Sequence, residues 1–89
     1  MITIDVSAVG DERELHAVLA VTLHFPSIYG MNWDAFWDAI TGLVQIPDRL
    51  RFVGWAHLRQ QVPRGATTLR QALDRYRSQY RPEFVAEYV

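Results

Sequence analysis

The chain has 89 residues, of which 49% are hydrophobic, and this length and composition predict one small globular domain over residues 1–89. It contains no cysteine, which excludes disulfide bonds, cysteine-based metal sites and a catalytic thiol. The formal net charge of −1 argues against strong, sequence-independent binding to nucleic acid.

The charges are divided unevenly along the chain. Residues 1–48 carry seven acidic residues and one arginine, whereas residues 49–89 carry eight arginines and three acidic residues. The two parts therefore have formal charges of −6 and +5. Between Glu14 and Asp48 there is no lysine or arginine, so an acidic surface formed there would attract a basic partner.

The N-terminal part predicts a strand followed by a helix. Apolar and polar residues alternate over residues 1–6, as expected for a strand with one buried face. This segment is too short and too polar for the apolar region of a signal peptide, so we expect a cytoplasmic protein. A helix is predicted to begin at Asp11, with acidic residues in its first turns and an inward stripe of Leu15, Val18, Leu19 and Thr22.

The segment from Phe25 to Val44 predicts a loop followed by a helix. Pro26 and Gly30 interrupt the loop, and Asn32 is a good helix N-cap because its side-chain oxygen can accept from the free backbone N–H groups ahead. The predicted helix covers residues 32–43. Its apolar stripe consists of Trp33, Phe36, Trp37, Ile40 and Val44.

Two aspartates lie beside this apolar stripe. Asp34 and Asp38 are one helical turn apart and share a face with Thr41. Like charges at this spacing repel, and aspartate is a poor helix former, so the pair does not serve helix stability. The helix dipole accounts for Asp34 but not for Asp38, which lies beyond the first turn. The face is either a solvated acidic surface or a binding surface.

The C-terminal half predicts two strands and two helices. In order, we expect a strand over residues 49–53, a short helix over 55–62, a break at 63–65, a helix over 66–80 and a strand over 84–89. The longer helix has an inward stripe that includes Tyr76 and Tyr80. On its outer strip, opposite charges four residues apart are expected to pair with one another: Arg70, Asp74, Arg77 and Arg81. This order of elements predicts an α/β fold with parallel strands joined by right-handed crossovers.

Residues 26–42 have the pattern P-x-x-Y-G-x-N-x-D-A-x-W-D-A-x-T-G. It closely resembles the barstar family of intracellular ribonuclease inhibitors, and the similarity extends to Leu15-His16, Pro47 and Gly65-Ala66. The resemblance covers nearly the whole chain. It implies a single small domain with a three-stranded parallel sheet packed with about four helices.

The resemblance also implies a function, which is to bind and block the active site of a small secreted guanyl-type microbial ribonuclease. Such an enzyme presents a cationic cleft to RNA, so an inhibitor can place carboxylates where the phosphate oxygens would lie. By resemblance, Asp38 enters the phosphate position, and Asp34 and Trp37 flank it. The expected partner-binding residues are Ile28, Tyr29, Gly30, Asn32, Asp34, Trp37, Asp38, Thr41, Gly42 and Arg75. No cofactor, metal or catalytic residue is implied.

Three positions depart from the family pattern. Ile28 stands where the best-known member has a tyrosine, Met31 replaces an acidic residue of the same loop, and Arg75 replaces an acidic residue of the last helix. We therefore expect a partner related to the family's reference ribonuclease but not interchangeable with it. For three of the expected partner-binding residues a purely structural role is the alternative: packing for Tyr29 and Trp37, and helix capping for Asn32.

Two other classes of function would use parts of the same sequence. An enzyme would need a third group beside Asp34 and Asp38, and a metal site completed by His24 would rest on two oxygens one turn apart. The main alternative is a nucleic-acid-binding module that uses the arginine-rich C-terminal half. Basic and aromatic residues interleave there, in Arg75, Tyr76, Arg77, Tyr80 and Arg81, although both tyrosines belong to the predicted inward stripe.

Overall fold

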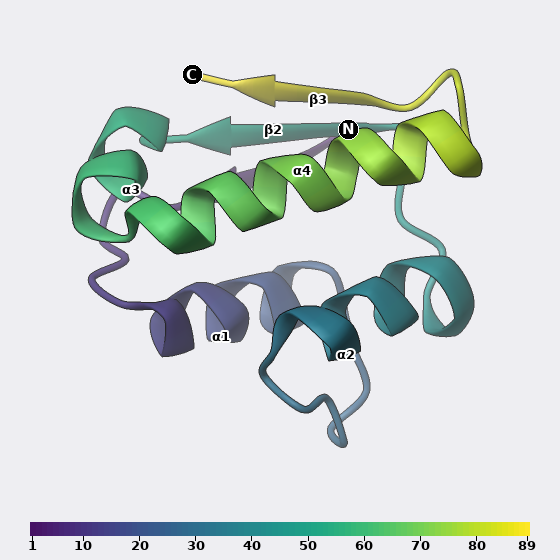
Figure 1. The fold of residues 1–89 in the computed structure, drawn as a ribbon, viewed down its shortest axis with the longest axis horizontal. Coiled ribbons are helices and arrows are strands. Elements are labelled where there is room, and N and C mark those ends of the chain that lie inside the picture. The colour runs from purple at the N-terminus through teal and green to yellow at the C-terminus, as the bar shows by residue number, and fades with distance from the viewer.

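Three parallel strands form the sheet of this fold. The computed structural model describes all of residues 1–89. The strands β1 (Ile2–Asp5), β2 (Arg49–Val53) and β3 (Val85–Tyr88) lie in the order β1-β2-β3, with β2 in the middle (Figure 1). In the registers of the two strand pairs, Phe52 lies opposite Ile4 on one side and Tyr88 on the other. The predicted three-stranded parallel sheet is confirmed.

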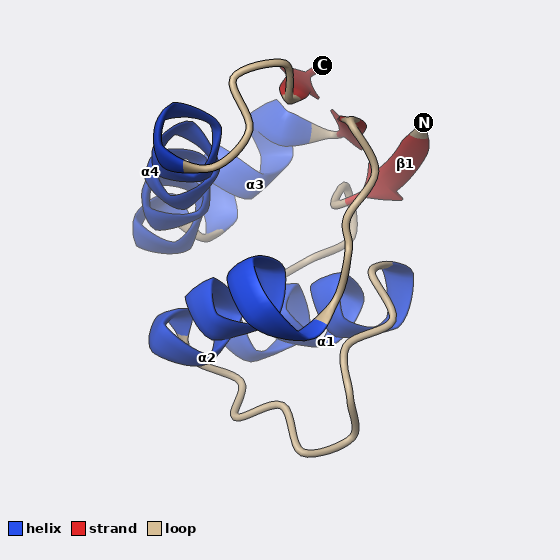
Figure 2. Ribbon diagram, turned by 90° about the vertical axis from the view of Figure 1, so that its right-hand side faces the viewer, coloured by secondary structure: helices blue, strands red, loops and turns tan.

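Helices make both connections between the strands. From β1 to β2 the chain passes through α1 (Glu12–Thr22), α2 (Trp33–Asp38) and a π-helical segment, η1 (Ala39–Leu43). From β2 to β3 it passes through α3 (Trp55–Gln61) and α4 (Pro63–Gln79). Figures 1 and 2 show α3 and α4 beside the sheet and α1 and α2 in a second layer below them. The α/β class with four α-helices is confirmed.

One apolar cluster of 21 buried residues joins these layers. On β2 the buried residues Leu50 and Phe52 alternate with exposed ones, so the sheet buries one face and leaves the other in solvent. From the helical layers, Leu15, Phe36 and Leu69 enter the same cluster. Burial of this apolar surface is the main favourable term in folding for a chain without disulfides.

The predicted helix over residues 32–43 changes character after its second turn. Residues 39–43 form η1, and the N–H of Val44 donates to the carbonyl of Ala39 across five residues. Val44 itself has extended backbone and lies outside the helix, but its side chain packs against the core, as the predicted stripe requires. Two features weaken the α-helical pattern of backbone hydrogen bonds here: the Thr41 hydroxyl donates to the Trp37 carbonyl at 2.7 Å, and Gly42 is a weak helix former.

The break predicted at residues 63–65 is wrong, because these residues form the first turn of α4. Pro63 suits that position since the N–H it lacks would have no helical partner there. Gly65 is buried, and a Cβ on it would lie 2.9 Å from Val62 Cγ1 and 3.1 Å from Glu12 Cγ. The glycine therefore allows α4 to approach α1 closely and does not end a helix.

The other end of α4 also differs from its prediction. Tyr80 is 55% exposed and follows the last helical residue, so it does not belong to the inward stripe. The arginines of the outer strip do not pair with Asp74. Arg81 forms ion pairs with Asp48 and Glu83, Arg70 lies over the Tyr88 ring, and the Nε of Arg77 donates to the Pro82 carbonyl. Each of these arginines contacts a residue outside α4, which the spacing of charged residues within the helix does not predict.

Candidate protein-binding site

Asp34 and Asp38 lie on the solvent-facing side of α2. The Asn32 side-chain oxygen caps this helix by accepting from the Ala35 N–H at 2.7 Å. Phe36, two residues from each aspartate, is fully buried and fixes the rotation of the helix. Both carboxylates are exposed and neither belongs to an ion pair within the chain. Their charge is therefore available to another molecule.

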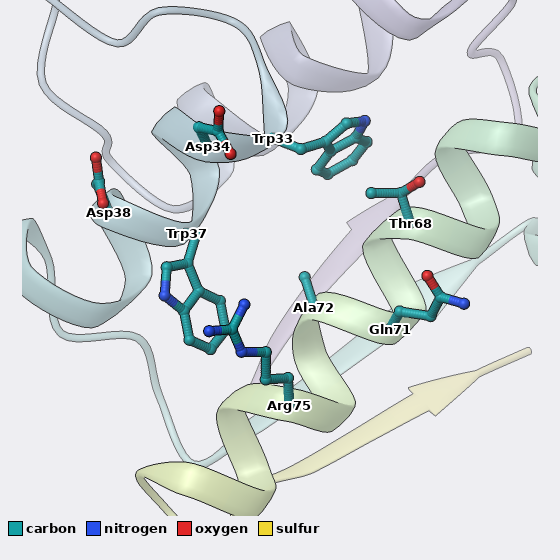
Figure 3. Close-up of a pocket in the computed structure, with 8 residues that line it drawn as sticks. All are labelled: Trp33, Asp34, Trp37, Asp38, Thr68, Gln71, Ala72 and Arg75. Atoms are coloured by element: carbon teal, nitrogen blue, oxygen red, sulfur yellow. The ribbon is translucent and has the colours of Figure 1, made fainter.

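An open groove of about 490 Å³ runs between α2 and α4 beside these carboxylates (Figure 3). Helix α2 contributes two acids and two indole rings to its lining, and α4 contributes polar side chains and one cation. The lining residues are Trp33, Asp34, Trp37, Asp38, Thr68, Gln71, Ala72 and Arg75. The groove thus carries opposite charges on its two walls.

Arg75 and Trp37 meet across this groove. The guanidinium carbon of Arg75 lies 4.2 Å from the centre of the Trp37 ring, within the range of a cation–π interaction. The Trp37 ring also meets Tyr80 edge to face, at 5.9 Å between ring centres. Trp37 is half-buried, so it packs against the core and also lines the groove. The structure brings together Asp34, Trp37, Asp38 and Arg75.

The loop before α2 presents a different surface. Ile28 is 85% exposed, whereas the neighbouring Tyr29 is half-buried with its hydroxyl 2.6 Å from Nδ1 of His16. Burial raises the pKa of Tyr29 well above its usual range, so its hydroxyl stays protonated. The Asn32 side-chain amide donates to the Gly30 carbonyl at 3.1 Å. Tyr29 and Asn32 thus hold the shape of the loop, and Ile28 projects from it.

Thr41 and Gly42 lie apart from the groove. They line a separate depression near the end of η1 that also includes Tyr80 and Arg81. The predicted site residues therefore fall into three neighbouring groups: the loop before α2, the groove beside the acids, and the η1 depression.

His16 is the residue whose role here the sequence pattern did not reveal. It is 3% exposed, and its ring lies 4.3 Å from that of Trp33 as well as against Tyr29. The indole N–H of Trp33 in turn donates to Glu12 at 2.8 Å. His16 therefore connects α1 to the loop before α2 and to the start of α2. Its position directly after the buried Leu15 was the available signal.

The structure does not support two of the rival sites. No three histidine, aspartate or glutamate side chains are grouped to hold a metal ion, so the site imagined from Asp34, Asp38 and His24 is not formed. Of the interleaved basic and aromatic residues 75–81, Tyr76 is buried and Arg81 is paired with Asp48, which leaves Tyr80 as the one exposed tyrosine ring.

No helix is both long enough and apolar enough to cross a membrane.

A protein-family model described as "Barstar (barnase inhibitor)" matches residues 1–89. The chain belongs to the barstar family. This confirms the family resemblance drawn from the pattern of residues 26–42. Because barstar-family proteins are inhibitors and not enzymes, the prediction that the chain is not an enzyme is confirmed as well.

A curated relative from Bacillus subtilis (strain 168), named "Putative ribonuclease inhibitor YrdF", is 52% identical over 33 residues. The matched segment covers 37% of this chain and 36% of that protein. The similarity to this relative is therefore strong but confined to about a third of each protein.

The pH dependence of folding stability tests the role of His16 in holding the loop before α2. Burial lowers the pKa of His16 below its ordinary value of 6.5, although the nearby Glu12 opposes this. The unfolded chain then binds more protons than the folded one, so the free energy of unfolding should fall as the pH drops below about 6.5 toward the folded-state pKa. Urea denaturation between about pH 5 and pH 8 measures this fall.

The matched controls for this prediction are single histidine variants. His16→Gln should reduce the loss of stability in that pH range, whereas His24→Gln, which changes an exposed side chain, should leave it in place. An identical pH profile for wild type and His16→Gln would show that His16 does not couple protonation to folding.

Proposed function

We propose that this barstar-family protein binds a small secreted guanyl-type microbial ribonuclease and blocks its active site with Asp34 and Asp38. The observation that carries the proposal is that the two carboxylates on α2 are exposed and form no ion pair within the chain. The fully buried Phe36 holds them outward. Structural needs of the helix do not account for Asp38. Family membership supplies the class of partner.

The carboxylates are suited to replace phosphate. A ribonuclease cleft holds the phosphate with cationic side chains, which would form charge-assisted hydrogen bonds to carboxylate oxygens. Trp37 and the loop residues Ile28, Tyr29 and Gly30 flank the acids and would cover the rim of the cleft, excluding water from the charged contacts. Inhibition then needs no chemical step, only occupation of the substrate position. We place this activity in the cytoplasm, where an inhibitor would protect RNA from an enzyme not yet secreted.

The proposal is tested by titrating the protein into barnase and a panel of other small secreted microbial ribonucleases while RNA cleavage is measured. We expect stoichiometric loss of activity for at least one enzyme. The inhibited enzyme should also be protected from inactivation by active-site reagents. A protein that inhibits none of them at micromolar concentration would contradict the proposed function.

Association should depend strongly on salt. The charge of −6 on residues 1–48 includes both groove acids and would attract a basic enzyme before contact. Salt screens this attraction over about 8 Å at physiological ionic strength. Stopped-flow measurements should show an association rate that falls by about tenfold or more between low and high salt, with a smaller change in dissociation. A salt-independent association rate would mean that the charge division is incidental.

A further inference from the structure

We propose that Arg75 selects the partner: the ribonuclease bound by this chain carries a carboxylate at the edge of its cationic cleft, and Arg75 forms an ion pair with it. This inference rests on the proposed function. It adds a requirement to that function, because the partner must offer negative as well as positive charge to the groove.

Arg75 is held in place before any partner arrives. Its guanidinium carbon lies 4.2 Å from the centre of the Trp37 ring (Figure 3), and that ring also contacts Tyr80 edge to face. A long arginine side chain otherwise loses rotamer freedom on binding, so this contact reduces the entropy lost when a complex forms. The groove thus presents a cation in a fixed position.

The hydrogen-bonding edge of this guanidinium is free. Stacking uses the flat face of the group, and its N–H donors lie around the rim, where they can bind a carboxylate with two parallel hydrogen bonds. Arg75 belongs to no ion pair within the chain, although two carboxylates line the same groove. Arg81, by contrast, is already paired with Asp48 and Glu83.

Arg75 is the single cation among the eight residues that line the groove. An enzyme with only positive charge around its cleft would place a like charge against Arg75 while its cations meet Asp34 and Asp38. Such an arrangement lowers affinity and so discriminates against that enzyme. An enzyme with an acidic side chain at this position would satisfy both walls of the groove. The distribution of charge therefore favours the second kind of partner.

The test uses the ribonuclease of the panel that the wild-type protein binds most tightly, with barnase included in that panel. Arg75→Glu should raise the dissociation constant by about 100-fold, because it removes an attraction and adds a repulsion, and Arg75→Gln by about tenfold. The matched control is Arg70→Glu, which makes the same change of charge on α4 at a residue stacked over Tyr88 and outside the groove. It should change the constant by less than about threefold.

A double-mutant cycle identifies the partner group. Each aspartate or glutamate around the enzyme's cleft is changed in turn to its amide, and binding is measured with wild type and with Arg75→Gln. One enzyme variant should abolish the effect of Arg75→Gln, which locates the carboxylate. If no enzyme variant does so, or if Arg75→Glu binds as tightly as wild type or more tightly, the inference is overturned.

Failure of this inference is distinguishable from failure of the proposed function. When Asp38→Ala loses binding but Arg75→Glu does not weaken it, only the role of Arg75 is overturned. When the wild-type protein inhibits no ribonuclease, the proposed function is overturned and the role of Arg75 with it. Circular dichroism and thermal unfolding of each variant separate both outcomes from loss of the fold.

Discussion

Asp38→Ala is expected to abolish tight binding to the target ribonuclease. Truncation of a charged residue at the centre of an interface costs about 4–7 kcal/mol in the strongest cases, which is a rise in the dissociation constant of about three to five orders of magnitude. Much of this cost arises because the enzyme's cations lose their partner and are left poorly solvated. Titration calorimetry and residual RNA cleavage measure the loss.

The same substitution should not damage the fold. The Asp38 side chain is exposed and makes no ion pair within the chain, and its removal relieves a like-charge contact with Asp34. The free energy of unfolding should therefore stay within about 0.5 kcal/mol of wild type. Asp74→Ala is the matched control, since Asp74 is also exposed and unpaired but lies outside the groove. An Asp38→Ala variant that still inhibits fully would exclude phosphate mimicry by this residue.

The acidic face of α2 could be predicted because exposure follows the helical period. Asn32, Phe36 and the two aspartates act within a few residues of one another, and a capping residue with a regular apolar stripe determines which way each side chain points. The structure has the predicted cap and the predicted burial of Phe36. Local patterns of this kind survive tertiary folding because the core reinforces them.

The error at the start of α4 and the change at η1 have another origin. Gly65 looks like a helix breaker, but its small size is used for the approach of α4 to α1. Thr41 looks like an ordinary face residue, but its hydroxyl competes for the Trp37 carbonyl and accompanies a widened turn. In both cases the residue type allows several roles, and the choice depends on the surrounding structure.

The stack of Arg75 on Trp37 could not be predicted from spacing. Resemblance to a family marked both residues as candidates, but whether a side chain of α4 reaches α2 depends on how the two helices pack. The same is true of His16 and Tyr29, which lie on α1 and in the loop before α2. Contacts between distant segments require the fold, and the fold here places Arg75 beside the acids.

Phe36→Ala should lower the stability of the fold but leave the binding surface of the folded protein unchanged. Asp38→Ala should do the reverse, although the two residues share one short helix. Phe36 is fully buried, with its ring 5.4 Å from that of Trp33 and 5.9 Å from that of Phe25. Truncation of a buried phenylalanine costs about 3–5 kcal/mol, because apolar contacts are lost and a cavity remains. Small domains have a total stability of about 5–15 kcal/mol, so much of the protein would unfold on mild heating. Urea denaturation measures the loss.

The folded fraction of Phe36→Ala should still bind, because its carboxylates are unchanged. Saturating ribonuclease should then raise the melting temperature of the variant, since a ligand that binds only the folded state stabilises it by mass action. Leu43→Ala is the matched control: its side chain is 60% exposed, and the change should cost less than about 0.5 kcal/mol. A loss below about 1 kcal/mol for Phe36→Ala would show that the core does not anchor α2. The outward orientation of Asp34 and Asp38 would then need another cause.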